Sequence, residues 1–178
     1  MKMTKLFLLL ASIGVFTISF GREADAQIQT ATAKLNVTAS VIKACTIGVT
    51  PVAFSPYDPT ALDPNITGQG TVTIACTPGT APTVALGLGN NVGAGNQRNM
   101  KDTATGGTNL LKYGLFQDST RNTTPWGDGT LGGIVATPSP AAVADNKAVI
   151  FQVYGQIPAL QSVVESSYAD QVVATVNF

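Results

Sequence analysis

The 178-residue chain contains no histidine. Histidine is the general base of Ser–His–Asp and Cys–His sites and a common ligand of zinc, so its absence excludes those nucleophilic centres and imidazole-bound zinc. Charged residues make up 11% of the chain, and the 10 basic and 10 acidic side chains form no clusters. The sequence therefore has no basic stripe for nucleic acid and no acidic tail.

Long apolar runs are also missing after the first residues. A positively charged start precedes an apolar stretch over residues 6–20, and the small-x-small pattern Ala24-Asp25-Ala26 follows. This order is typical of a secretory signal peptide, and the stretch is short for a membrane span of ~20 residues. We therefore predict a signal peptide over residues 1–26, cleavage between Ala26 and Gln27, and no transmembrane segment in the exported protein. An uncleaved N-terminal anchor is the alternative.

Cysteine is scarce, with two copies, Cys45 and Cys76. In an exported, oxidising compartment an even pair predicts a disulfide, worth roughly 3–4 kcal/mol by the loop-entropy relation. A redox-active pair is disfavoured because the spacing is not C-x-x-C. Two free buried thiols are the alternative.

What the chain has in excess is a regular alternation over Gln29–Val41. The odd positions from Ala31 to Val41 are apolar, and the even positions from Thr30 to Ser40 are polar. This period is typical of a half-buried strand, but the stretch is about twice the usual length of ~5–6 residues. It is either one long strand of a complete sandwich, or a core strand preceded by an extension that pairs with another chain.

Further strands are predicted where apolar and β-branched residues alternate between Gly, Pro and Asn turns. They cover Ile42–Ile47, Thr71–Cys76, Thr83–Leu88, Asn109–Gln117, Ala148–Tyr154 and Tyr168–Phe178, with a brief edge strand over Arg98–Lys101. From Pro51 to Asn65, four prolines predict a long irregular connection. Short strands with hardly a helix predict an all-β sandwich.

The two ends of the predicted sheet do not match. The strand over Tyr168–Phe178 runs to the last residue, so nothing follows it to pair with its far edge. An open apolar edge is a template for another strand, and the N-terminal alternation is too long for one strand. The N-terminus has more strand pattern than its own sheet needs, and the C-terminal strand lacks a partner. This combination fits β-strand addition between subunits, as in donor-strand complementation of pilins.

The chain resembles the spore coat protein U domain family, as found in Csu-type major subunits of archaic chaperone–usher pili. The matching pieces, in order, are Lys34-Leu35-Asn36-Val37, Cys45-Thr46, Cys76, Arg98-Asn99-Met100, Leu111-x-Tyr113-x-Leu115, Trp126-Gly127-Asp128-Gly129-Thr130, Val153-Tyr154-Gly155-x-Ile157-Pro158 and Tyr168-x-Asp170 with the ending Phe178. The chain departs from the pattern at Gln156, where a basic residue is frequent, and at Ser166-Ser167, where Pro-Gly is common.

The resemblance implies an incomplete immunoglobulin-like β-sandwich that lacks its last strand and carries the disulfide Cys45–Cys76. It also implies a periplasmic chaperone that lends a strand until the next subunit replaces it, and an outer-membrane usher as the exit. We therefore expect a donor-strand extension over residues 27–38 and a pilin domain over residues 39–178. The protein would be a structural pilus subunit on the cell surface, bound to copies of itself and supporting adhesion and biofilm formation.

The predicted site has two parts. The donor strand presents the apolar parity of the extension, namely Ala31, Ala33, Leu35, Val37 and Ala39. The acceptor groove is partly floored by the terminal strand, through Tyr168, Val172, Ala174, Val176 and Phe178. Fully burying Leu35 and Val37 would contribute roughly 3–6 kcal/mol.

Other functions find little support in the sequence. Glycoside hydrolysis needs two carboxylates close together, and nothing indicates this for Asp118, Asp128, Glu165 or Asp170. Asp128-Gly129 lacks the further oxygen ligands of a calcium loop. We expect no catalysis, no cofactor and no metal. The alternatives that stay open are a secreted spore or capsule coat protein of the same fold and a monomeric secreted binding module.

Overall fold

The structure is a computed structural model that describes residues 28–62, 66–122, 125–129 and 145–178. The predicted signal peptide and its cleavage site at Ala26 and Gln27 lie outside these residues. The chain falls into two units, Met1–Ala39 and Ser40–Phe178. Residues 28–39, the described part of the first unit, contain no strand or helix, and their side chains are all exposed.

The alternation over Gln29–Val41 therefore forms no strand within its own chain, and the first strand begins at Cys45. The prediction that Val41 and Ile42 already belong to the sheet is wrong. A strand exists by pairing its main-chain groups with a neighbour, and no described segment of this chain forms a β-ladder with residues 28–44.

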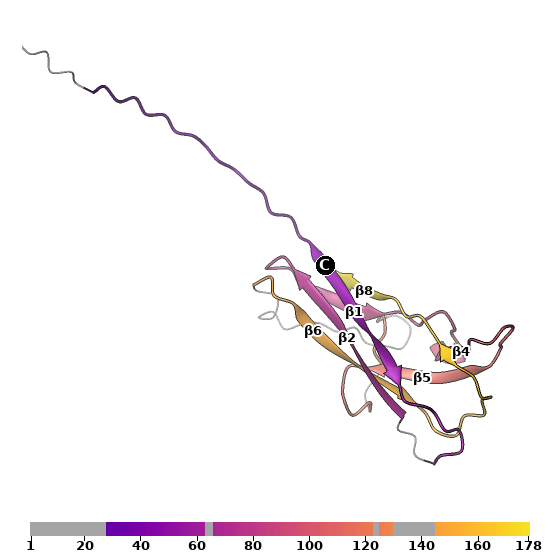
Figure 1. Ribbon diagram of the computed structural model, residues 1–178. Helices are drawn as coiled ribbons and strands as arrows, with labels where there is room; N and C mark the ends of the chain where they lie inside the picture. The colour runs from indigo at the N-terminus through magenta and orange to yellow at the C-terminus, as the bar shows by residue number, and fades with distance from the viewer. Residues whose placement is uncertain (1–27, 63–65, 123–124, 130–144) are drawn as a thin grey trace, which may run out of the picture. The chain divides into compact units, whose positions relative to one another are not determined.

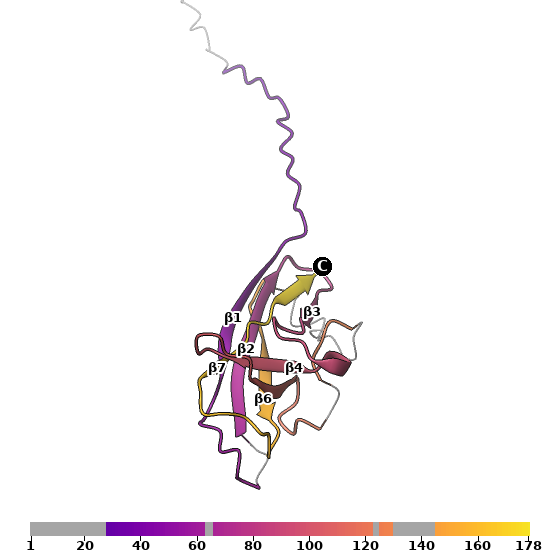
Figure 2. The same ribbon diagram turned by 90° about the vertical axis from the view of Figure 1, so that its right-hand side faces the viewer.

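The described part of the second unit holds eight strands, all paired antiparallel. They are β1 (Cys45–Phe54), β2 (Ile66–Cys76), β3 (Thr83–Leu86), β4 (Arg98–Asp102), β5 (Leu110–Phe116), β6 (Val149–Ile157), β7 (Tyr168–Ala169) and β8 (Ala174–Asn177), with one 3-10 turn, η1 (Ala94–Asn96). Six form a sheet in the order β1-β2-β6-β5-β4-β7, and β3 pairs with β8. Figure 2 shows β4 crossing the direction of β1, β2 and β6, and Figure 1 shows β5 running across the same strands, so the large sheet curls.

The core lies inside this curl. Its buried members come from both sheets and from one loop: Val72, Ile74, Cys76, Val84, Leu86, Met100, Leu111, Tyr113, Leu115, Trp126, Val153 and Ile157. Trp126 is fully buried, its indole Nε1–H donates to the Val84 carbonyl at 2.9 Å, and its ring lies 5.9 Å from that of Phe151. The prediction of an all-β sandwich is confirmed.

Strand β1 continues through Pro51, where the sequence predicted the start of an irregular connection. Its register against β2 shifts between Thr50 and Ala53, which marks a β-bulge. Proline is tolerated there because β1 lies at the edge of the sheet and needs no second ladder. Beyond the bulge, Val52 and Phe54 pack against the core.

Glycines beneath β1 make room for these two side chains. A Cβ on Gly155 would lie 2.6 Å from the Phe54 ring and 2.8 Å from a Val52 methyl carbon. We expect Gly155→Ala to lower the free energy of unfolding by roughly 1–3 kcal/mol through overpacking. Gly48→Ala is the matched control, because a Cβ there meets no atom within 4 Å and the change should stay within about 0.5 kcal/mol. Equilibrium urea unfolding of both variants measures this; equal losses would contradict it.

The C-terminal segment was predicted as one strand over Tyr168–Phe178, and this is wrong. β7 pairs with β4 in the large sheet, whereas β8 pairs with β3 in the small one. Between them the main chain crosses from one sheet to the other, and the Val173 carbonyl accepts a hydrogen bond from the Gly87 N–H at 2.9 Å. The side chain of Asp170 holds this crossing, as described below.

Candidate functional site

An open apolar groove lies beside the free edge of β1. Among the described residues, β1 is paired on one side by β2, and β8 on one side by β3. The groove has a volume of about 1110 Å³. One wall is the chain from Val49 to Tyr57, the other is residues 163–172, and the floor is the core itself, through residues such as Leu111 and Val153.

Two side chains of β1 face the core and yet remain open to solvent. Ile47 and Val49 pair in register with Ile74 and Val72, so the four side chains point to the same face of the sheet. Ile74 and Val72 are 0% and 2% exposed, whereas Ile47 and Val49 are 41% and 63% exposed. Side chains on the core face of a sandwich are normally covered by the opposite layer. Among the described residues, no opposite layer therefore covers this part of β1.

The opposite wall is anchored by the carboxylate of Asp170. Its Oδ1 accepts from the Asn90 N–H at 2.9 Å and from Asn91 Nδ2 at 3.0 Å, and its Oδ2 accepts from the Tyr113 hydroxyl at 2.6 Å. A Cβ on Gly89, whose φ is +87°, would collide with this carboxylate. These bonds fix residues 170–173, which lie in no strand, and so define the position of the wall.

Burial and the hydrogen bond to Asp170 raise the pKa of Tyr113. Above its ordinary pKa of about 10, an unfolded chain loses this phenolic proton while the folded chain keeps it. Folding stability should therefore fall as pH rises above about 10, by up to ~1.4 kcal/mol per pH unit from this group. In Tyr113→Phe this fall is absent, so the stability difference between wild type and variant should shrink from pH 9 to 11. Urea unfolding across this range measures it; parallel pH curves would contradict it.

The far end of the same wall is held by Gln161. Its side-chain amide makes both main-chain bonds of a strand partner with Lys112: the Lys112 N–H donates to Oε1 at 2.7 Å, and Nε2 donates to the Lys112 carbonyl at 3.0 Å. The Tyr57 hydroxyl accepts from the Gln161 N–H at 2.8 Å and donates to the Pro158 carbonyl at 3.1 Å. The segment before residue 163 is thus fixed to both β5 and the β1 side of the groove.

Arg98 supports the core behind the groove. Its side chain is 4% exposed and donates to three carbonyls, those of Leu86, Gly87 and Trp126, at 2.7–2.9 Å. Burial lowers the pKa of Arg98, and the nearby Tyr113 and Asp170 act in the opposite direction. The guanidinium therefore ties β4 to the end of β3 and to the Trp126 loop, which keeps the floor of the groove in place.

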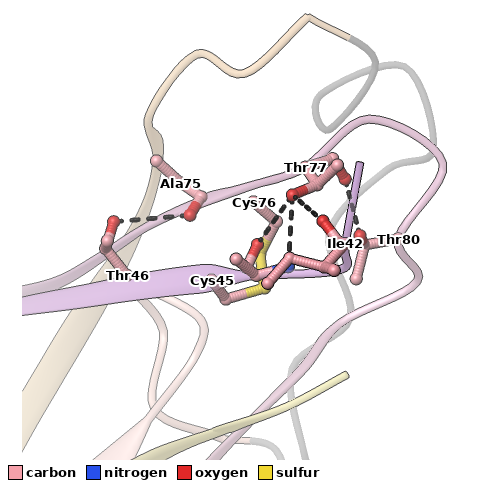
Figure 3. The surroundings of a disulfide bond; sticks show 8 residues. Ile42, Cys45, Thr46, Ala75, Cys76, Thr77 and Thr80 are labelled. Carbon is pink, nitrogen blue, oxygen red and sulfur yellow. Dashed lines mark hydrogen bonds between the residues drawn. A yellow bond between two sulfur atoms is a disulfide. The ribbon is translucent and has the colours of Figure 1, made fainter. Parts of the chain in front are cut away.

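The predicted disulfide Cys45–Cys76 is confirmed. The two residues lie opposite each other in the β1–β2 ladder, with Cα atoms 4.1 Å apart. Figure 3 shows the disulfide beside Thr77, whose hydroxyl donates to the Ile42 carbonyl at 3.2 Å and accepts from the Ala44 N–H at 3.1 Å. The bond therefore joins β1 to β2 at the point where the N-terminal segment enters the sheet.

The structure places the predicted groove residues as follows. Tyr168, Val172 and Ala174 line the groove. Val176 packs against the core, and Phe178 is largely exposed; neither is among the lining residues. The predicted donor residues Ala31, Ala33, Leu35, Val37 and Ala39 are all exposed.

Sequence reasoning missed the β1 wall of the groove. It assigned Pro51 to a connection and so left Val49, Val52 and Phe54 without a role. The signal that could have found this wall is the alternation around Pro51, together with Gly68-x-Gly70, which lies opposite the bulge. Small residues facing a proline-containing strand are typical of an edge that bulges inward.

Cation and membrane sites find no support in the described residues. Over residues 28–62, 66–122, 125–129 and 145–178, no three His, Cys, Asp or Glu side chains lie close enough to bind a metal ion. Within the same ranges, no helix is both long and apolar enough to cross a membrane.

The sequence matches the model of the spore coat protein U domain over residues 31–175. The chain belongs to the spore coat protein U domain family. A curated relative, protein U of Myxococcus xanthus, is 35% identical over 170 residues, which cover 86% of this chain and 88% of the relative.

A solved structure shares the fold of this family member. It is the pre-assembly complex of a chaperone and the tip adhesion subunit from archaic chaperone–usher Csu pili of Acinetobacter baumannii. The alignment has a TM-score of 0.57 and 23% identity, and it covers 78% of this chain. Our chain spans 40% of the length of that chain. The likeness shows an immunoglobulin-like sandwich, as the sequence resemblance implied.

Proposed function

We propose that this protein is a structural subunit of a surface fibre, assembled by strand addition. The N-terminal extension of one subunit inserts into the groove of the next, and a periplasmic chaperone fills the groove until then. The subunit leaves through an outer-membrane usher and reaches the cell surface as part of a pilus. In this role the fibre supports adhesion and biofilm formation, and the domain carries no catalytic centre.

One observation carries this proposal: Ile47 and Val49 face the core but lie open beside the unpaired edge of β1. A sandwich exposes such residues when the strand that should cover them comes from elsewhere. An inserted strand would cover these side chains and give the main-chain groups of the free edges a partner.

The extension has the properties of such a strand. Leu35 and Val37 are 87% and 85% exposed and lie on one parity with alanines. At ~3.3 Å per residue, residues 28–39 would extend about 40 Å as a strand, long enough to run beside the ten-residue β1. Its apolar parity would face the groove floor, and its Thr, Lys and Asn side chains would face solvent.

A second candidate is a secreted coat protein of the same fold. It is favoured by the 35% identity to protein U and by the extent of the family match. Such a coat would use the same groove and extension but need no usher. Exporting the protein with its chaperone, in cells with and without an usher, distinguishes the two, because a pilus subunit reaches the cell surface only when the usher is present.

Unheated gel electrophoresis of material sheared from cells tests strand addition. Subunits joined by inserted strands should run as a ladder that collapses on boiling. Deleting residues 27–34 should leave export intact and abolish the ladder, because the inserted strand loses Ala31, Ala33 and the main-chain hydrogen bonds of eight residues. A ladder that persists after the deletion would overturn the donor role of the extension.

A control variant separates the loss of apolar contacts from a general effect on export. Thr32→Ala combined with Lys34→Ala changes only the polar parity of the same stretch. These positions would face solvent in the inserted strand, so the ladder should persist. Loss of the ladder in this variant as well would show that insertion does not depend on the apolar side chains of the extension.

A further inference from the structure

The disulfide and several hydrogen bonds hold the chain at the point where the extension enters the domain. Ahead of the disulfide, the Thr77 N–H donates to the Ala44 carbonyl at 2.9 Å, and the Thr77 hydroxyl bonds both Ile42 and Ala44. Thr80, which is buried, donates its hydroxyl to the Thr77 carbonyl at 2.6 Å. In Figure 3 these bonds surround the disulfide on the Thr77 side.

Strand β1 is poorly placed to resist a pull on the extension. Among the described residues of its own chain it pairs with β2 alone, and its core-facing Ile47 and Val49 are partly open to solvent. A strand inserted on its other side belongs to another subunit and is joined to β1 by non-covalent bonds alone. A force on its first residue would load the bonds to β2 one after another, starting at the entry point. Each net hydrogen bond contributes about 1 kcal/mol, so bonds loaded singly give way in sequence.

Strand β2 has the opposite character. It pairs with β1 on one side and β6 on the other, over the registers Cys45↔Cys76 and Gly70↔Val153 among others. Its side chain Ile74, two residues before Cys76, is fully buried. A force delivered to Cys76 therefore passes along β2 to Ile74, which is buried in the core and pairs with Val149 of β6.

We propose that the Cys45–Cys76 disulfide is a mechanical staple, which passes tension from the extension around edge strand β1 into the central strand β2. This role of the disulfide rests on the proposed function, because only a fibre subunit is pulled through its extension. Without the staple, tension peels β1 and removes one wall of the groove that holds the neighbouring subunit. With it, the pull reaches β1 only as far as Cys45.

Single-molecule stretching of the full mature chain tests the staple. Handles attached at the N-terminus and the C-terminus, by chemistry that spares cysteine, would pull the extension away from β1. One sample keeps the disulfide, and in the other it is reduced in the flow cell after the chain has folded. The comparison therefore needs no cysteine variant, which could fail to fold. A free peptide of residues 28–41 is added to both samples, so that the groove is occupied in each.

The expected difference is an additional early event. The reduced chain should first release β1, ten residues or about 35 Å of contour length, at less than half the force of the main unfolding event. The oxidised chain should show no such step. Thr77→Val in the oxidised protein should free only residues before Cys45, and the main event should keep its force, because the staple remains. Reduced and oxidised chains that both unfold without the early step would overturn the proposal.

A second pulling geometry separates force transmission from general stability. A handle at Thr105, in the exposed turn between β4 and β5, together with the C-terminal handle, directs tension away from β1. Reduction should then produce no early β1 step. The same early step in both geometries would mean that the disulfide only stabilises the fold, which would also contradict the staple. Failure of strand addition itself is read separately, from the gel ladder.

Discussion

Replacing Leu35 by aspartate is expected to lower the affinity of the extension for the groove by at least ~100-fold. In the inserted strand the leucine would be buried over the core floor, and such burial contributes about 1.5–3 kcal/mol. An aspartate at that position would lose this term and bring an unpaired charge into an apolar site. Since every 1.4 kcal/mol changes a dissociation constant tenfold, the two effects together exceed two orders of magnitude. Titration of the folded domain with peptides of residues 28–41 measures the change.

The chain offers a closely matched control for this substitution. Asn36→Asp adds the same charge one residue away, on the parity that would face solvent. Its affinity should stay within about threefold of the wild-type peptide, since exposed charges contribute little. If the two peptides weaken equally, binding depends on net charge rather than on an inserted apolar parity, and the proposed arrangement is wrong.

Replacing Arg98 by methionine is expected to destabilise the domain by about 3–5 kcal/mol. Removing one partner of a buried charged network leaves the others unsatisfied, and such losses commonly reach this size. Here three carbonyls, those of Leu86, Gly87 and Trp126, would lose their donor inside the fold. A domain stable by 5–15 kcal/mol would then be marginal, so export yield should fall as well.

Lys101→Met is the control on the same strand. Lys101 is exposed and lies three residues after Arg98, so its replacement should change the free energy of unfolding by less than about 0.5 kcal/mol. Equilibrium denaturation of both variants measures the difference. A loss at Arg98 no larger than the loss at Lys101 would show that the carbonyls find other donors or water.

Much of this fold follows from local patterns that the sequence carries openly. Thr71–Cys76 alternates without interruption and forms the second half of β2, since a period of two suits a strand that buries one face. The disulfide was predicted from the number of cysteines and from the predicted signal peptide. Leu111, Tyr113 and Leu115 were predicted to share one face of a strand, and all three are buried on β5.

The parts that could not be predicted depend on distant contacts. Pro51 stays in β1 because that strand is an edge, and edge position is a property of the sheet rather than of the residues near Pro51. The break between β7 and β8 depends on Asp170 meeting Asn90, Asn91 and Tyr113, which lie 57–80 residues away in sequence. Periodicity reports which face of a strand is apolar but not which sheet the strand joins.

For the proposed site, the sequence delimits the extension more fully than the groove. The apolar parity of residues 31–39 needs no tertiary information, because the extension stays outside the fold. The groove was assigned in part, through the terminal strand, whereas its lining also includes β1 from Val49 to Phe54 and the segment 163–172. A groove is formed by segments remote in sequence, so no local pattern delimits it.

The place of β6 in the large sheet has a consequence for the speed of folding. β6 lies between β2 and β5, and it pairs Val153 with Gly70, so the sheet cannot close before residues 149–157 are available to pair. Domains dominated by such long-range pairing fold in milliseconds to seconds rather than microseconds. The Cys45–Cys76 loop, with a separation of 31 residues, can close much earlier. We expect the folding chain to spend most of its folding time as a cross-linked β1–β2 hairpin before β6 pairs with β2.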